Sequence, residues 1–128
     1  MRALLDTHAL LWWLDGDRKL STRARHLIER DDVEIFVSAA SAWEIATKMR
    51  SGKLPGAVEV AEDLPGVLRS QRFTSLSITV RHAQAAGLLV WPRRDPFDRM
   101  HAAQAILEGM PLVSVNGVFD ETEVTRFW

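Results

Sequence analysis

The chain has 128 residues, of which 47% are hydrophobic and 26% are charged, as expected for one globular domain with a core of its own. A formal net charge of -1 excludes a protein that holds nucleic acid by its overall charge, so any nucleic acid must be bound locally. The absence of cysteine excludes disulfides, thiolate metal sites and cysteine nucleophiles. We therefore expect a single domain, residues 1–128, in a reducing compartment.

Short apolar runs alternate with helical patterns along the whole chain. In chain order, "RALLD" precedes "THALLWWL", "EIFVS" precedes "SAWEIATKMR", "SLSI" precedes "TVRHAQAAG", and "DPFDRMHAAQAI" precedes "PLVSV". This alternation predicts an α/β fold with three layers, in which helices cover both faces of a mainly parallel sheet. The sheet is expected to have four strands, and "VTRFW" would add a fifth.

The first apolar run is interrupted by Asp6, Thr7 and His8, so the sequence predicts neither a signal peptide nor a membrane span. We expect a soluble, cytoplasmic protein with no membrane partner. Further along, "GKLPGAVEVAEDLPGVLRSQRF" contains two Pro-Gly pairs around a modest helical pattern. This stretch predicts a broken helical segment rather than a linker between domains.

Three acidic residues from distant segments are expected at one edge of the sheet. Asp6 ends the first predicted strand, Glu44 lies in the predicted first turn after the second strand, and Asp98 lies in the first turn of the helix before "PLVSV". The carboxyl ends of parallel strands share one edge, where ligands bind. Crowded carboxylates repel one another unless a cation relieves them, and oxygen ligands suit Mg²⁺ or Mn²⁺. The four histidines show no paired ligand spacing, and none is assigned to a metal.

Helix capping offers an alternative explanation for each of these acids. Asp6 could cap the first helix, and Ser41 with Glu44 in "SAWE" has the spacing of a capping box. In "DPFDR", Asp95 could be an N-cap and Asp98 a favourable first-turn carboxylate. Capping explains each acid singly. It leaves the crowding of three negative charges unexplained, which favours the cation site.

Three stretches in this order and spacing resemble a known family. They are "LLDTHALLWWL", "VSAASAWEIATKMRSGKL", and "DPFDRMHAAQA" followed by "PLVSVNGVF", and together they span nearly the whole chain. The sequence resembles the PIN domain, specifically the VapC-like toxins of bacterial toxin-antitoxin pairs. The resemblance implies Mg²⁺- or Mn²⁺-dependent cleavage of tRNA, rRNA or mRNA, with products that carry a 5'-phosphate and a 3'-hydroxyl. It also implies a cognate VapB-like antitoxin and a homodimer.

Carried over by position, the acidic cluster of the family falls on Asp6, Glu44 and Asp98. The resemblance implies a metal ion held by Asp6 and Asp98, with Glu44 positioning or deprotonating the attacking water. Where many relatives have a fourth acid, this sequence has Asn116, which is expected among the metal residues because its amide oxygen can bind or orient a metal water. The amide adds no negative charge, which leaves a second ion in question. Asp120 is a weak substitute for that acid. Asp95 is expected to cap the helix or to support the site.

Several polar residues near these acids are expected to bind substrate or shape the site. They are Thr7, Lys48 and Arg99, although Lys48 could instead only form a helical i,i+4 pair with Glu44. Other cations could form a rim for RNA phosphates: Arg50, Lys53, Arg93 and Arg94.

The chain has five tryptophans, an unusually high number for its length. Trp12 and Trp13 are adjacent and cannot both face one core, so one of them is expected to face a partner. Trp43 is expected in the core, and Trp91 is a candidate for stacking on unpaired bases.

Other function classes stay open on the sequence alone. A PIN-like binding module without catalysis is motivated by Asn116. A haloacid-dehalogenase-type phosphatase would need a second aspartate two residues after Asp6, where His8 stands. A receiver-type phosphoacceptor would need adjacent acids after the first strand, which the sequence lacks.

Overall fold

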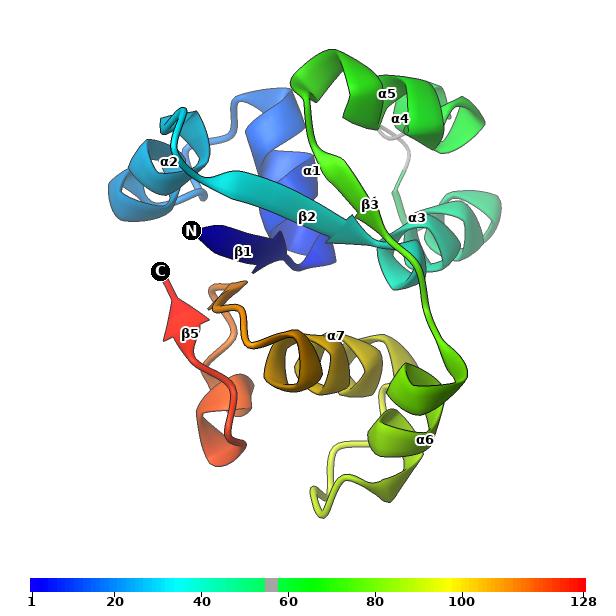
Figure 1. Ribbon diagram of the computed structural model, residues 1–128. Coiled ribbons are helices and arrows are strands. Elements are labelled where there is room, and N and C mark those ends of the chain that lie inside the picture. Colours follow the sequence, from blue (N-terminus) through cyan, green and yellow to red (C-terminus); the bar gives the residue numbers. More distant parts are fainter. Residues whose placement is uncertain (55–57) are drawn as a thin grey trace.

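The computed structural model describes residues 1–54 and 58–128 (Figure 1). Its centre is a five-stranded sheet in the order β3-β2-β1-β4-β5. The strands are β1 (Arg2–Leu5), β2 (Glu34–Ser38), β3 (Thr74–Leu76), β4 (Leu112–Val113) and β5 (Arg126–Phe127). Every neighbouring pair is parallel. The prediction of a parallel sheet of four to five strands is confirmed, and "VTRFW" supplies the fifth.

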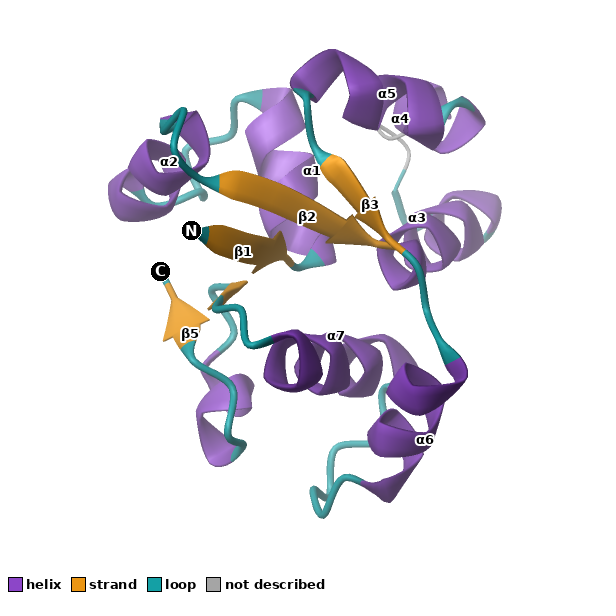
Figure 2. Cartoon of the chain, viewed as in Figure 1, coloured by secondary structure: helices purple, strands orange, loops and turns teal. Residues whose placement is uncertain are grey.

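Helices lie on both sides of the sheet, with α1, α4 and α5 on one side and α6 and α7 on the other (Figure 2). The helices are α1 (Thr7–Asp15), α2 (Thr22–Glu29), α3 (Ala39–Arg50), α4 (Val58–Glu62), α5 (Leu64–Gln71), α6 (Val80–Leu88), α7 (Pro96–Glu108) and the 3₁₀ helix η2 (Gly117–Glu121). The predicted broken helical segment corresponds to α4 and α5, while its first Pro-Gly pair lies outside the described residues. Within the described chain, no helix is both long enough and apolar enough to cross a bilayer.

Alternate side chains of the strands enter two separate cores. Along β1, Ala3 and Leu5 join the core under α1, α2 and α5, whereas Leu4 joins the core under α7 and η2. Strand β4 divides in the same way, with Val113 in the first core and Leu112 in the second. This period of two is the reason the apolar runs are nearly continuous, since the central strands are covered on both faces.

The strand order reverses at β1. From β1 the chain continues to β2 and β3 on one side, and it later returns to place β4 and β5 on the other side. In a parallel α/β sheet, the carboxyl ends of the two strands at such a reversal leave a crevice between the loops that follow them. The residues that follow β1 and β4 therefore face one another, and those that follow β2 lie beside them.

The expected caps of α1 and α7 are confirmed. The Oδ1 atom of Asp6 accepts the amide hydrogen of Ala9 at 2.8 Å and so caps α1. Asp95 caps α7, and Pro96 is its first helical residue. Gly109 ends α7 with φ +64, a left-handed conformation in which glycine has no Cβ penalty. Asp6 and Asp95 thus cap helices and also lie at the edge of the sheet where the pocket forms.

The start of α3 differs from the sequence prediction. The helix begins at Ala39 directly after β2, because the Oγ of Ser38 accepts the amide hydrogen of Ala40 at 2.9 Å. The predicted capping box of Ser41 and Glu44 is therefore wrong, since Ser41 lies inside the helix. Glu44 lies in the second turn rather than the first, one turn further from the strand end.

Candidate active site

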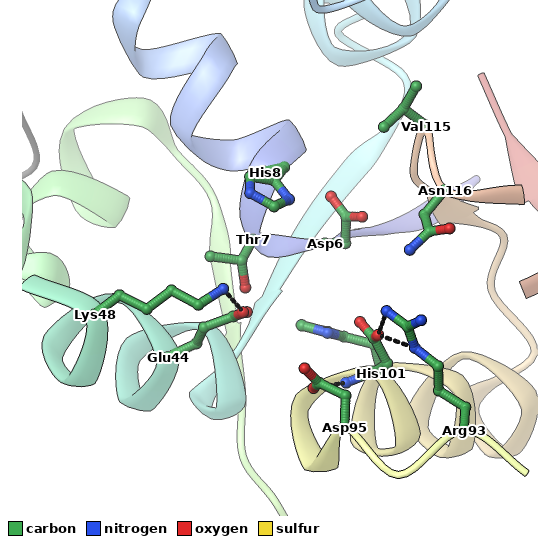
Figure 3. A pocket seen from close by; sticks show the side chains of 11 residues that line it. Asp6, Thr7, His8, Glu44, Lys48, Arg93, Asp95, His101, Val115 and Asn116 are labelled. Carbon is green, nitrogen blue, oxygen red and sulfur yellow. Dashed lines mark hydrogen bonds and ion pairs between the residues drawn. The ribbon is translucent and has the colours of Figure 1, made fainter. Parts of the chain in front are cut away.

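The edge of the sheet where the strand order reverses carries a polar pocket (Figure 3). The pocket is lined by Asp6, Thr7, His8, Glu44, Lys48, Arg93, Asp95, Asp98, His101, Val115 and Asn116. Of the site residues expected from the sequence, Asp6, Thr7, Glu44, Lys48, Asp95, Asp98 and Asn116 are brought together here. Arg99 and Asp120 are not among the lining residues. The structure thus gathers acids from the end of β1, from the second turn of α3 and from the start of α7.

Asp6 is buried because it joins β1 directly to α1. Only 8% of the residue is exposed. Burial raises the pKa of Asp6 above its usual value, and hydrogen bonds from the Ser114 side chain and the Ala9 amide oppose this rise only in part. An ionised Asp6 is therefore held in a place that disfavours its charge, and a nearby cation would stabilise it.

Glu44 and Lys48 form an ion pair across one turn of α3 (Figure 3). Glu44 is buried, and Lys48 is partly exposed at the rim of the pocket. The i,i+4 pairing expected from the sequence is confirmed. Since the pair lies within the pocket, Lys48 serves both the helix and the electrostatics of the site.

Asp98 is paired with Arg93 from the loop before α7. Two nitrogens of the guanidinium, Nε at 2.8 Å and Nη2 at 2.7 Å, contact the same carboxylate oxygen, Oδ2. Burial raises the pKa of Asp98, Arg93 counteracts this rise, and neighbouring Asp95 adds to it. Arg93 therefore partly neutralises an acid that burial and a like charge both disfavour.

Arg99 turns away from the pocket and binds backbone instead. Its guanidinium donates hydrogen bonds to the carbonyl oxygens of Ala86 at 3.0 Å, Leu89 at 2.7 Å, Trp91 at 2.8 Å and Arg93 at 2.9 Å. With a longer fifth contact to the Gly87 carbonyl at 3.4 Å, these hydrogen bonds fasten the end of α6 and the segment after it to the start of α7. Arg99 thus shapes the site through the backbone that carries Arg93.

A hydrogen-bonded chain of three side chains links the helices that carry the acids. The hydroxyls of Thr7 and Ser41 lie 3.0 Å apart, and the Ser41 hydroxyl lies 3.1 Å from Nε2 of His101. All three residues are buried. They belong to α1, α3 and α7. These hydrogen bonds therefore fix the spacing of the helix that Asp6 caps and of the two helices that contain Glu44 and Asp98.

Sequence reasoning missed His101 as a pocket residue. The side chain is 1% exposed, and burial lowers its pKa although the four pocket acids act in the opposite direction, Asp6 most strongly. Its position three residues after Asp98 places both on one helical face. That spacing is the signal that could have identified it, but a histidine without a paired partner in sequence carries little information.

Asn116 lines the pocket from the loop after β4. Its Oδ1 accepts the amide hydrogen of Val118 at 3.1 Å and caps η2. Asp120 lies on η2 but is exposed, and both of its carboxylate oxygens contact the guanidinium of Arg126, at 2.9 and 3.0 Å. This ion pair holds Asp120 outside the pocket, so Asn116 occupies the position after β4 where a fourth acid was considered.

The aromatic predictions require three corrections. Trp43, expected in the core, is 58% exposed. Trp91, considered for base stacking, is only 7% exposed, packs against Phe119 and donates its indole hydrogen to Glu121 at 3.0 Å. Trp12 and Trp13 are both partly buried against the core below α1, so neither is fully turned outward.

The donor set of the pocket fits a hard divalent cation. Carboxylates, an amide oxygen and hydroxyls are the ligands that Mg²⁺ and Mn²⁺ prefer. Within residues 1–54 and 58–128, however, no three histidine, aspartate or glutamate side chains converge on one ion position. The acids are present in one pocket, and two of them contact cationic side chains.

A comparison with known families decides the relationship. A family model described as the PIN domain matches residues 3–124. The chain belongs to the PIN domain family. No curated protein sequence matches it. The resemblance inferred from the sequence motifs is therefore confirmed for the family, and the phosphatase and receiver alternatives have no support.

Solved structures share the fold of this PIN domain. A chain of VapBC2 from Rickettsia felis bound to a promoter DNA fragment is 16% identical with a TM-score of 0.68, over 99% of this chain and 98% of that one. A chain of a toxin-antitoxin complex from Klebsiella pneumoniae is 18% identical with a TM-score of 0.69, over 98% and 96%. A chain of VapBC-1 from nontypeable Haemophilus influenzae is 15% identical with a TM-score of 0.68, over 99% and 97%. The similarity extends over whole chains.

The substitution Asp6→Asn is expected to stabilise the protein at neutral pH in the presence of EDTA. The folded pKa of Asp6 lies above the unfolded value, so its stabilising contribution is present below about pH 3.8 and is lost as pH rises through the folded pKa. Asparagine removes this loss and keeps an oxygen for the Ala9 amide. Urea unfolding measures the difference, which should shrink as pH falls toward about pH 4.

Asp120→Asn is the matched control, because Arg126 lowers the pKa of the exposed Asp120 and the substitution should not stabilise the protein. A less stable Asp6→Asn variant at neutral pH would contradict the electrostatic explanation.

Proposed function

We propose that the protein is a metal-dependent endoribonuclease that acts as the toxin of a toxin-antitoxin pair and is found in the cytoplasm. The observation that carries the proposal is the pocket at the reversal of strand order in a PIN domain. Asp6, Glu44 and Asp98 all line this pocket. Full-length similarity of the fold to chains of VapBC complexes supports the toxin class. The substrate is tRNA, rRNA or mRNA.

In this proposal, Asp6 and Asp98 hold Mg²⁺ or Mn²⁺, and Asn116 contributes its amide oxygen. The bound ion would polarise the scissile phosphate and lower the pKa of a nearby water. Asp95 supports the site from the start of α7, where its Oδ1 accepts the amide hydrogen of Asp98 at 3.1 Å. Thr7 supports the site through the buried hydrogen bond between its hydroxyl and the hydroxyl of Ser41.

Glu44 is the acid that we assign to the attacking water. Its carboxylate lies at the pocket wall, where it forms an ion pair with Lys48 and can orient a water molecule. The water attacks phosphorus, the bond from phosphorus to the 3' oxygen breaks, and the products carry a 5'-phosphate and a 3'-hydroxyl. No covalent intermediate with the protein is needed.

Asp6→Asn, Glu44→Gln and Asp98→Asn are each expected to reduce RNA cleavage by at least about a hundredfold while the fold is kept, since general-base and charge contributions have this size. Amides can still accept capping hydrogen bonds, but they cannot supply the charge. The measurement is cleavage of total cellular RNA with Mn²⁺, read by end-mapping.

Asp120→Asn serves as the control and should cleave like the wild type, because Asp120 pairs with Arg126 outside the pocket. Wild-type activity in all three pocket variants would refute the site. If the wild type binds RNA and never cleaves it, the protein is instead a PIN-like binding module.

Asn116→Asp is expected to tighten metal binding by about three- to tenfold, a modest gain for a charged ligand that is partly solvated. One aspartate oxygen can still accept the Val118 amide hydrogen, which leaves the other free for the ion. Calorimetric titration with Mg²⁺ and Mn²⁺ gives affinity and stoichiometry for both proteins. Unchanged values would place residue 116 outside the ion's ligands.

The proposed partners are a VapB-like antitoxin and a second copy of the chain in a homodimer. Whole-chain likeness to members of VapBC complexes supports an antitoxin partner, and our proposal is that this antitoxin covers the pocket. Light scattering of the purified protein is expected to give the mass of a dimer. The product of the neighbouring gene should copurify with it and suppress cleavage. A monomer at micromolar concentration that no neighbouring product inhibits would contradict both assignments.

A further inference from the structure

The two cations that line the pocket are both engaged by acids of the same pocket. Lys48 pairs with Glu44, its neighbour on α3, whereas Arg93 reaches Asp98 from the separate loop before α7. Asp98 is one of the acids that we assign to the metal ion. The Arg93 pair therefore places a protein cation on a carboxylate that the proposed function assigns to a metal cation.

The geometry of this pair makes it exchangeable. Two of the three guanidinium nitrogens, Nε and Nη2, contact Oδ2 of Asp98, so the other carboxylate oxygen, Oδ1, takes no part in this contact. The side chains of Arg93 and Asp98 are 39% and 20% exposed, so the pair lies at the partly exposed rim of the pocket, where water can reach it and weaken it. The Arg93 backbone is fixed, because its carbonyl accepts a hydrogen bond from Arg99 at 2.9 Å. A change of partner thus needs only side-chain rotation.

We propose that Arg93 is the internal counterion of Asp98, that a divalent ion displaces it, and that the released guanidinium then binds an RNA phosphate at the pocket. The inference rests on the proposed function and adds a substrate-positioning role for Arg93. A divalent ion and a guanidinium repel each other at one carboxylate oxygen. Once displaced, Arg93 stays within the pocket, and a phosphodiester is a suitable bidentate partner for it.

This exchange couples the ion to the RNA. Without the ion, Arg93 is occupied by Asp98 and contributes little to RNA binding. With the ion bound, the guanidinium is free to contact phosphate. By linkage, RNA that engages Arg93 also favours the ion, because it removes the competitor of the ion from Asp98.

The first measurement is Mn²⁺ affinity by calorimetry, with the wild type, Arg93→Gln, Arg93→Lys and Arg94→Gln. We expect Arg93→Gln to bind Mn²⁺ roughly three- to tenfold more tightly, as loss of a partly exposed competing pair allows. Lysine, which keeps the charge without the fork, should give an intermediate affinity. Arg94 is the matched control, because it is exposed, adjacent and outside the pocket, and its variant should bind like the wild type.

The second measurement is RNA recognition. Arg93→Gln should raise KM for RNA cleavage about threefold or more in saturating Mn²⁺, the loss expected for a single phosphate contact. It should leave the affinity for the same RNA in EDTA unchanged. A merely structural role would not produce tighter metal binding together with weaker, metal-dependent RNA recognition.

The outcomes separate this inference from the proposed function. If the wild type binds Mn²⁺ and Arg93→Gln binds it equally or more weakly, the exchange is refuted and the nuclease proposal stands. If neither protein binds Mn²⁺, the metal site itself is refuted, and the exchange with it. Tighter binding of Mn²⁺ by Arg93→Gln with a raised KM supports the exchange.

Discussion

The structure depends on one electrostatic constraint, the crowding of carboxylates at a single edge of a parallel sheet. The reversal of strand order at β1 opens a crevice there, and the chain places acids around it from segments that are far apart in sequence. Burial raises the pKa of both Asp6 and Asp98, so folding works against their ionisation. The hydrogen bonds and ion pairs around the two acids offset part of the free energy that burial of their charges costs.

The buried hydrogen bonds that support the acids are rigid, whereas the ion pairs at the rim of the pocket are exchangeable. The buried chain of Thr7, Ser41 and His101 ties three helices together, and it leaves each helix little freedom to move its acid. Arg93 and Lys48, by contrast, reach the acids from the partly exposed rim. In the proposed function the site binds an ion and then a polyanion, and it would benefit from this division because the ligand positions would stay fixed while the counterions change.

Much of this arrangement could be predicted from the sequence, and the exceptions have physical reasons. The alternation of strands and helices gave the parallel sheet, and the position of Asp6 at a strand end gave its place in the pocket, because both follow from local periodicity. The start of α3 was misplaced since Ser38 and Ser41 are both good caps, and only the end of β2 decides between them. The roles of Arg99 and His101 depend on contacts across the fold, which no local pattern encodes. The exposure of Trp43 is likewise set by what α3 packs against.

The charges of the pocket bear on how many ions it would hold. Four carboxylates, Asp6, Glu44, Asp95 and Asp98, face two protein cations, so the formal balance is two negative charges when both histidines are neutral. One divalent ion would neutralise this remainder, whereas a fourth-strand aspartate at residue 116 would leave a third negative charge and favour a second ion. Asn116 therefore matches a pocket whose lining already includes an arginine and a lysine beside the acids. If the proposed nuclease function holds, these protein cations would do part of the work that a second metal ion does in two-metal nucleases.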